Sequence, residues 1–252
     1  MVSKWALLFV VLFIGPACCG SEPLVIAATE WAPYSGSQLL NKGFSPELFT
    51  VVMSRKGYEV DVVILPWSRA LKGTYEGTFD ALLDVWYSDE RAKKLIFSKP
   101  YMTNRVKFIK RVDSKIKSTD FADLRHYEIG VVRDYAYEPQ FDQSPVLKKS
   151  SERTFLVNLY KLVKRRIDLT LEDEFVARFE IAHKAPELQD LVTFLPTPLS
   201  ENNLYVGFSK KNKHVETLVS DFDDSLRALI LDGTYERLKA KHGILWRWDY
   251  YP

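Results

Sequence analysis

Short apolar runs alternate with amphipathic segments along most of the chain. Residues 24–28, 60–65 and 81–85 are apolar enough to form buried strands. Helices are expected between them. One begins at Ser45-Pro46-Glu47, with serine as the cap and proline in the first turn, and the next follows Pro66. The pattern therefore predicts a βαβαβ unit whose strands are largely parallel.

The same alternation continues in the rest of the chain, without internal repeats or low-complexity stretches. A strand at 106–110 runs into a charged segment, and a second set of strands and helices follows it. The remaining expected elements are strands at 128–132, 168–171 and 204–208, and helices from about 135, at 153–164 and within 226–243. The sequence thus predicts an α/β protein.

The first twenty residues have the pattern of a secretory signal peptide. Lys4 supplies the positive start, residues 5–14 are an unbroken apolar run, and Gly15-Pro16 breaks it. The run is too short to cross a bilayer, which takes about 20 residues. A short uncleaved anchor is the alternative, but the signal pattern fits better.

Both cysteines, Cys18 and Cys19, lie in the expected cleavage zone. Cleavage near Gly20 would leave no cysteine and hence no thiol chemistry in the exported protein. Lipid attachment at either cysteine is the alternative, but it would need an apolar residue three positions earlier, where Gly15 and Pro16 stand. We expect a periplasmic protein without a lipid anchor.

Composition argues against several classes of function. The net charge is +2, which gives no reason to expect nucleic acid or an anionic membrane surface as partner. The four histidines lack metal-ligand spacing, and no nucleophilic triad motif is present, so no metal, cofactor or enzymatic activity is expected. Six tryptophans, thirteen tyrosines and fifteen phenylalanines exceed what a core requires and favour an aromatic cleft.

Arg91 is the most informative single residue. Ser88 is the expected cap of a short helix, and a cation in the first turn of a helix is electrostatically disfavoured. The guanidinium therefore needs an anion. That anion is either a carboxylate of the protein itself, Asp84 or Glu90, or a group of a bound ligand.

The stretch around Arg91 resembles the family 3 extracellular solute-binding proteins, the amino-acid receptors of ABC importers. The matching residues are Gly77, Phe79-Asp80-Ala81, Ser88, Glu90-Arg91, Phe97-Ser98, Pro100-Tyr101 and the later Asp232-Gly233-Thr234-Tyr235. In that family the arginine binds the α-carboxylate of the ligand. The interval from Asp80 to Arg91 is one residue shorter than is usual, and larger residues replace the family's small ones in this loop.

The resemblance implies a two-lobed, type II periplasmic-binding fold with two crossover hinge strands. Lobe 1 would take residues 22–110 and 204–252, and lobe 2 would take residues 111–203. The ligand would lie between the lobes, which close around it by a hinge motion.

Asp173 is the second candidate that the resemblance supplies. It ends a phrase that begins at Arg166 and resembles one whose last aspartate takes the ligand's ammonium group. A role as the N-cap of the following helix fits Asp173 equally well. Because Glu172 and Glu174 flank it, the acidic role could belong to a neighbour.

Aromatic side chains are expected to line the cleft. The family loop that matches residues 30–34 carries an aromatic that lies over the ligand, which points to Trp31 and Tyr34. Trp67 and Trp86 follow predicted strands, at whose carboxyl ends open α/β sheets bind ligands. The remaining candidates are Arg69 and Arg133. Arg133 stands where the family has a Gly-Thr-Thr helix start, which suggests a larger or differently charged ligand.

We therefore expect a monomeric periplasmic receptor that captures a small amino-acid-like or anionic solute and delivers it to an ABC permease. Two alternatives remain. One is a periplasmic enzyme on the same fold, of dehydratase or lyase type, which would need a cleft carboxylate of raised pKa such as Glu30 or Glu172. The other is a sensory module that acts through a separate membrane partner.

Overall fold

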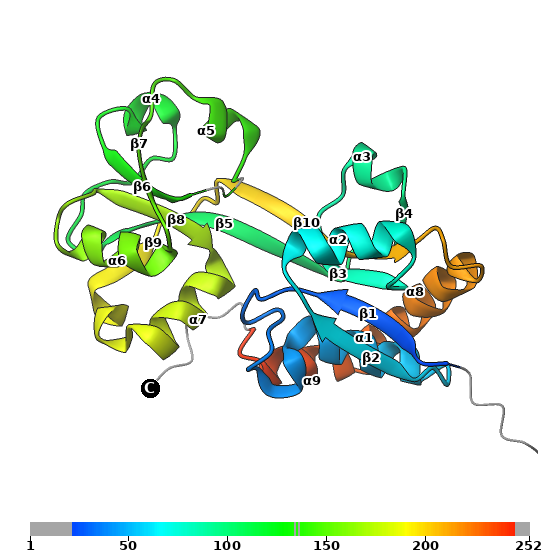
Figure 1. Cartoon of the computed structure of the whole chain (residues 1–252). Helices are drawn as coiled ribbons and strands as arrows, with labels where there is room; N and C mark the ends of the chain where they lie inside the picture. Colours follow the sequence, from blue (N-terminus) through cyan, green and yellow to red (C-terminus); the bar gives the residue numbers. More distant parts are fainter. Residues whose placement is uncertain (1–21, 134, 136, 245–252) are drawn as a thin grey trace, which may run out of the picture.

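The chain folds into two halves that are joined by two long strands (Figure 1). The computed structural model describes residues 22–133, 135 and 137–244, so the expected signal peptide at 1–20 and both cysteines lie outside the described residues. We call the half that contains the first three strands lobe 1, and the half that contains the parallel strands of residues 128–173 lobe 2.

Lobe 1 contains the βαβαβ unit that the apolar pattern predicts. Strand β1 (Leu24–Ala28) pairs in parallel with β2 (Val60–Ile64) and β3 (Ala81–Val85), and helices α1 (Phe44–Ser54) and α2 (Trp67–Glu76) connect them. All five residues of β3 are buried. The two faces of the sheet contribute to separate apolar clusters, because helices cover the sheet on both sides.

Lobe 2 repeats the arrangement with a second parallel sheet. Strand β6 (Glu128–Val132) lies between β7 (Lys148–Glu152) and β8 (Leu169–Asp173). Helix α6 (Phe155–Val163) connects β7 to β8, and α7 (Glu174–Lys184) begins directly after β8. The end of β8 therefore coincides with a helix N-terminus.

Strands β5 (Met102–Arg111) and β10 (Ser200–Ser209) run antiparallel and connect the lobes. One end of β10 pairs with β3 of lobe 1, while β5 pairs with β8 of lobe 2. Strand β10 thus pairs within lobe 1 and with β5, while β5 continues the pairing into lobe 2, which is the crossover arrangement expected of hinge strands. The lobe limits expected at 110 and 204 stay a prediction.

The remaining elements cover the sheets or connect them. Helices α8 (Val215–Leu231) and α9 (Thr234–Lys241) pack with α1 on lobe 1, where their apolar side chains complete its larger core. The short elements are η1 (Leu40–Lys42), α3 (Asp89–Ala92), β4 (Leu95–Phe97), α4 (Phe121–Leu124), α5 (Pro139–Gln143), η2 (Pro186–Leu191) and β9 (Val192–Phe194).

Some elements differ from the expectation, and each difference has a local cause. Strand β7 was not predicted because its sequence is entirely polar, as suits a strand that pairs with β6 at the edge of the sheet formed by the described residues. The helix expected from about residue 135 begins at Pro139, where Glu138 caps it by accepting a hydrogen bond from the Phe141 amide at 2.8 Å. Strand β8 extends to Asp173 because its acidic end pairs with β5, with Glu172 opposite Lys107 and Asp173 opposite Val106.

Candidate ligand-binding site

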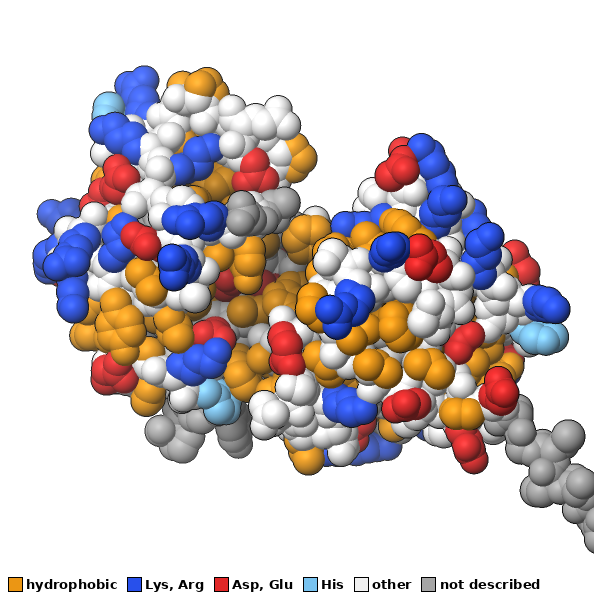
Figure 2. Space-filling view, in the orientation of Figure 1, with side chains coloured by type: hydrophobic (Ala, Val, Ile, Leu, Met, Phe, Trp, Pro, Cys, Tyr) orange, Lys and Arg blue, Asp and Glu red, His pale blue; other side chains and the backbone are white. Residues whose placement is uncertain are grey.

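A cavity of about 310 Å³ lies between the lobes, where Figure 2 shows the surface hollowed. Loops at the carboxyl ends of β1 and β3 border it from lobe 1, and the end of β8 borders it from lobe 2. Parallel α/β sheets bind ligands at this edge, because side chains and loops there are free of the sheet's own packing.

Arg91 lines this cavity without a carboxylate partner among the described residues. The Ser88 hydroxyl caps α3 by accepting a hydrogen bond from the Arg91 amide at 3.3 Å. The guanidinium donates to the Trp86 carbonyl oxygen at 2.6 Å and lies 5.1 Å from the centre of the Trp67 ring. Burial lowers the pKa of Arg91, but an arginine stays charged at neutral pH.

Neither Asp84 nor Glu90, the two acidic residues expected as partners, forms an ion pair with Arg91. Glu90 forms an ion pair with Lys93 at 2.5 Å. Asp84 is held by three hydroxyl groups instead. The anion that Arg91 needs is therefore not supplied by these two neighbours.

Asp173 is fully engaged by the protein. Its carboxylate caps α7 by accepting hydrogen bonds from the amides of Phe175 and Val176 at 3.0 and 2.9 Å. The Tyr34 hydroxyl donates to it at 3.1 Å, and the Arg105 amide donates at 3.2 Å. Burial raises the pKa of Asp173 to about 6, although these hydrogen bonds act in the opposite direction.

Glu172 also lines the cavity, and its carboxyl group is far less engaged. Among the described residues it accepts one hydrogen bond, from the Asp173 amide to Oε1 at 2.9 Å. Burial raises the pKa of Glu172 to about 8, and the charge of Asp173 adds to the shift. With no ligand bound, the group is therefore largely protonated at neutral pH.

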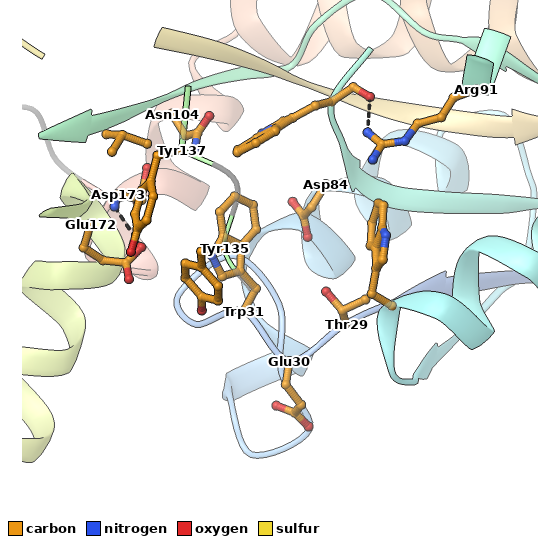
Figure 3. Close-up of a pocket in the computed structure, with 13 residues that line it drawn as sticks. Thr29, Glu30, Trp31, Asp84, Arg91, Asn104, Tyr135, Tyr137, Glu172 and Asp173 are labelled. Atoms are coloured by element: carbon orange, nitrogen blue, oxygen red, sulfur yellow. Dashed lines mark hydrogen bonds between the residues drawn. The ribbon is translucent and has the colours of Figure 1, made fainter. Parts of the chain in front are cut away.

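Asp84 is a third buried carboxylate at the cavity, on the lobe 1 side (Figure 3). The hydroxyls of Ser45, Tyr101 and Ser35 donate to it at 2.5, 2.7 and 2.8 Å. Burial raises its pKa, while the three hydrogen bonds act to lower it. These donors hold the carboxylate in place beside the strand end that leads to Trp86.

Aromatic rings form much of the remaining wall. Trp31, Trp67 and Trp86 line the cavity from lobe 1, and Tyr135 and Tyr137 line it from the β6 side. The expected wall residue Tyr34 is not among the lining residues. It is completely buried, with its ring centre 4.6 Å from that of Trp31, and it supports the site through its hydrogen bond to Asp173.

Two of the expected arginines do not line this cavity. Arg69 is exposed on α2. Arg133 is exposed beyond β6 and borders a separate hollow together with Lys149. The structure thus brings together Arg91, the tryptophans and the acids of β8, whereas any contact of Arg69 or Arg133 with a ligand stays a prediction.

Sequence reasoning did not select several lining residues. The sequence points to Asp84 only as a partner for Arg91. It points to Glu172 as a neighbour of Asp173 and, together with Glu30, as the carboxylate of raised pKa that the alternative enzyme would need; both glutamates line the cavity. Tyr135, Tyr137 and Asn104 were not selected. No sequence pattern pointed to Asn104, because its position at the cavity depends on how the crossover strand β5 passes between the lobes. Tyr135 and Tyr137 follow β6, so their position after a strand was the one available clue.

The described residues offer no support for a metal centre or a membrane span. No group of three or more histidine, cysteine, aspartate or glutamate residues in this part of the chain is arranged to hold a metal ion. Within the same part, no helix has the length and apolar character needed to cross a membrane.

The model of the bacterial extracellular solute-binding proteins, family 3, matches residues 24–244. The chain belongs to this family. The match covers both lobes and the crossover strands, so the resemblance inferred from the residues around Arg91 is confirmed. The α/β fold is that of the type II periplasmic-binding proteins.

Solved structures agree with this fold. AbpA from Streptococcus pneumoniae, an amino acid ABC transporter substrate-binding protein bound to L-arginine, matches with a TM-score of 0.66 at 19% identity, over 87% of this chain and 94% of that one. A histidine kinase sensor domain matches with a TM-score of 0.69 at 19% identity, over 88% and 96%. An ancestral amino-acid-binding protein, a precursor of cyclohexadienyl dehydratase, matches with a TM-score of 0.66 at 22% identity, over 87% and 94%.

Proposed function

We propose that this family member captures a small amino-acid-like solute in the cavity between its lobes and delivers it to an ABC permease. The observation that carries the proposal is Arg91, a charged guanidinium that lines the cavity without a carboxylate partner among the described residues. A solute carboxylate would form two parallel hydrogen bonds with it and supply the missing anion.

The opposite side of the cavity carries two acidic side chains. Figure 3 shows Glu172 and Asp173 on one side and Arg91 on the other. A molecule with a carboxylate at one end and an ammonium group at the other would match this separation. The tryptophans would cover its apolar part. The similarity to AbpA, whose structure holds L-arginine, supports an amino acid as the solute.

The cellular setting follows the family, whose members are extracellular. Residues 1–20 would direct export and be removed, which leaves a periplasmic monomer without a lipid anchor or cofactor. Delivery to a permease is supported by the similarity to substrate-binding proteins of amino acid ABC transporters. Uptake into membrane vesicles that contain the permease should then require the added protein.

The direct test is a thermal-shift screen of the purified protein against the L-amino acids, small organic acids and short peptides. A ligand at a hundred times its dissociation constant adds about 2.7 kcal/mol of stability, enough for a clear rise in melting temperature. Calorimetric titration of the best compound would then give its affinity. The proposal fails if no amino acid or amino-acid-like compound raises the melting temperature.

Arg91→Ala should weaken binding of that compound by about 2–5 kcal/mol, because the solute carboxylate would be left buried without a partner. Arg91→Lys should recover only part of the loss, since an ammonium cannot form the two-pronged contact. Arg227→Ala is the matched control, because this exposed arginine pairs with Asp224 on α8 and does not line the cavity. Equal affinities for all variants would contradict the assignment.

Glu172 favours a second candidate, an enzyme of the dehydratase or lyase type. A buried carboxyl group whose pKa is raised to about 8 holds a proton at neutral pH and can act as a general acid. The similarity to a dehydratase precursor agrees with this possibility. NMR spectra of the bound compound, followed over hours, would show conversion. Conversion that Glu172→Gln abolishes would replace the receptor proposal with this one.

A further inference from the structure

The two acidic residues at the end of β8 differ in what they can still bind. Asp173 accepts hydrogen bonds from three backbone amides and one tyrosine hydroxyl. A carboxylate has about four acceptor sites, so Asp173 is close to saturated. Glu172 accepts one hydrogen bond from the described residues, which leaves its second oxygen without a partner there.

No cation of the described residues forms an ion pair with Glu172. Lys107 lies opposite it in the β5–β8 register, but its ammonium pairs with Glu174 at 3.1 Å. The Arg105 guanidinium pairs with Glu201 at 2.7 Å. The other titratable groups around Glu172 are Asp173, Glu180 of α7, Tyr135 and Tyr137, and none of them supplies positive charge.

Asn104 on β5 is a second polar group without a partner on this side of the cavity. It is completely buried and lines the cavity, yet neither its amide nitrogen nor its amide oxygen has a hydrogen-bond partner among the described residues. Figure 3 shows it on the same side as Glu172 and Tyr137. A buried unpaired amide is costly, so a bound group that pairs with it would be favoured.

We propose that the positively charged group of the solute binds at Glu172, beside Asn104, rather than at Asp173, and that Glu172 releases a proton as it binds. This inference rests on the proposed function, and it assigns Asp173 to the protein's own structure. The solute cation takes the place of the proton on the carboxyl group, and the proton leaves to solvent, so charge is balanced in the buried site.

The release follows from the state of Glu172 in the empty cavity. With a pKa of about 8, the group is mostly protonated at pH 7, and an adjacent ammonium stabilises the carboxylate and lowers that pKa. Binding should therefore release about one proton per solute at pH 7. Affinity should rise from pH 6 to pH 8 by up to about tenfold per pH unit, and it should level off above the pKa of the empty site.

The test is calorimetric titration with the L-amino acid that gives the largest thermal shift, in phosphate and in Tris at one pH. Phosphate and Tris take up a proton with different enthalpies. The difference between the binding enthalpies measured in the two buffers therefore gives the number of protons released. Glu172→Gln should weaken binding roughly tenfold to hundredfold and abolish the release. Asp173→Asn should keep the affinity within about threefold and keep the release. Glu187→Gln, at a glutamate outside the cavity that accepts from Tyr160, is the control.

The outcomes separate this inference from the proposed function. Binding that survives Glu172→Gln unchanged but is lost in Asp173→Asn would overturn the inference and leave the receptor function standing. Proton release that persists in Glu172→Gln would overturn it too. If no amino acid binds the parent protein, the proposed function fails and the inference fails with it.

Discussion

At the scale of single residues, Asp84 shows how tertiary contacts give an ordinary strand residue a place in the site. It lies at the end of β3 with a φ of 59°, a left-handed conformation that aspartate tolerates better than most residues. Its three hydroxyl donors come from separate parts of lobe 1. The sequence showed an acid near Arg91, but only the folded chain shows that hydroxyls, not Arg91, hold it.

Glu172 should make the stability of the empty protein depend on pH. Its pKa is higher in the folded protein than the ordinary glutamate value of about 4.3, so the folded state binds the extra proton. The stabilisation of the folded protein by this proton is complete below about pH 4 and is lost as the pH rises to about 8. Unfolding free energies between pH 5 and pH 9 should fall, by up to about 1.4 kcal/mol per pH unit from this group.

Glu172→Gln isolates that effect. Asp173 and Asp84 also have raised pKa values and act in the same direction, but Asp173 completes its titration mostly below pH 7. Between pH 7 and pH 8.5 the variant should therefore show a flatter profile than the parent. Identical slopes in that window would show that Glu172 does not hold a proton in the empty protein.

At the scale of elements, helix α7 depends on its cap. Asp173 accepts the amides of Phe175 and Val176, two of the four amides that a helix N-terminus leaves without intrahelical partners. The same carboxylate accepts the Tyr34 hydroxyl of lobe 1. The start of α7 is thus tied to both lobes by one side chain.

Asp173→Ala should lower the free energy of unfolding by about 1–3 kcal/mol, because the cap is lost and the Tyr34 hydroxyl loses its acceptor. Asp173→Asn should cost less, since asparagine also caps helices well. Urea unfolding followed by circular dichroism would measure both. An alanine variant as stable as the parent would show that the capping hydrogen bonds contribute nothing.

Strands β1 to β3 and helices α1 to α3 could be predicted because they carry their signals locally, whereas β4 was not expected and α8 begins at Val215, ahead of the expected range of 226–243. Strand β3 is apolar except for Asp84, and α3 has a serine cap with acids in its first turn. Strand β7 could not be predicted, because Lys148–Glu152 is polar throughout and becomes a strand only by pairing with β6. Edge strands draw their stability from a neighbour, which a local pattern does not reveal.

At the scale of the whole molecule, β5 and β10 connect two lobes that otherwise have separate sheets. Glu172 and Asp173 line the cavity from lobe 2 and Arg91 lines it from lobe 1, so a bound zwitterion would attract both lobes. Hinge closure is the common response of such proteins to a ligand.

Addition of the amino acid selected by the thermal-shift screen should reduce the radius of gyration measured by small-angle X-ray scattering. Arg91→Ala at the same solute concentration should keep the radius of the empty protein, because the attraction from lobe 1 is lost. A saturated parent protein whose scattering curve does not change would show that binding occurs without closure.

The sequence by itself determined the α/β class and the family, and it singled out Arg91 as the leading candidate for ligand binding. These depend on apolar periodicity, capping residues and short phrases that lie close together in the chain. It also indicated that an acid near residue 173 matters. Sequence spacing could not tell which of Asp173 and Glu172 would bind the ligand and which would cap the helix. Either residue suits either role until its surroundings are known.

Only the tertiary structure decided how those acids are used. The hydrogen bonds that saturate Asp173 come from α7, from β5 and from Tyr34, far away in the sequence. The proton on Glu172 is kept by burial of the side chain in the folded protein. Charge state and free hydrogen-bonding capacity depend on the three-dimensional surroundings of a group, and these exist only once the chain has folded.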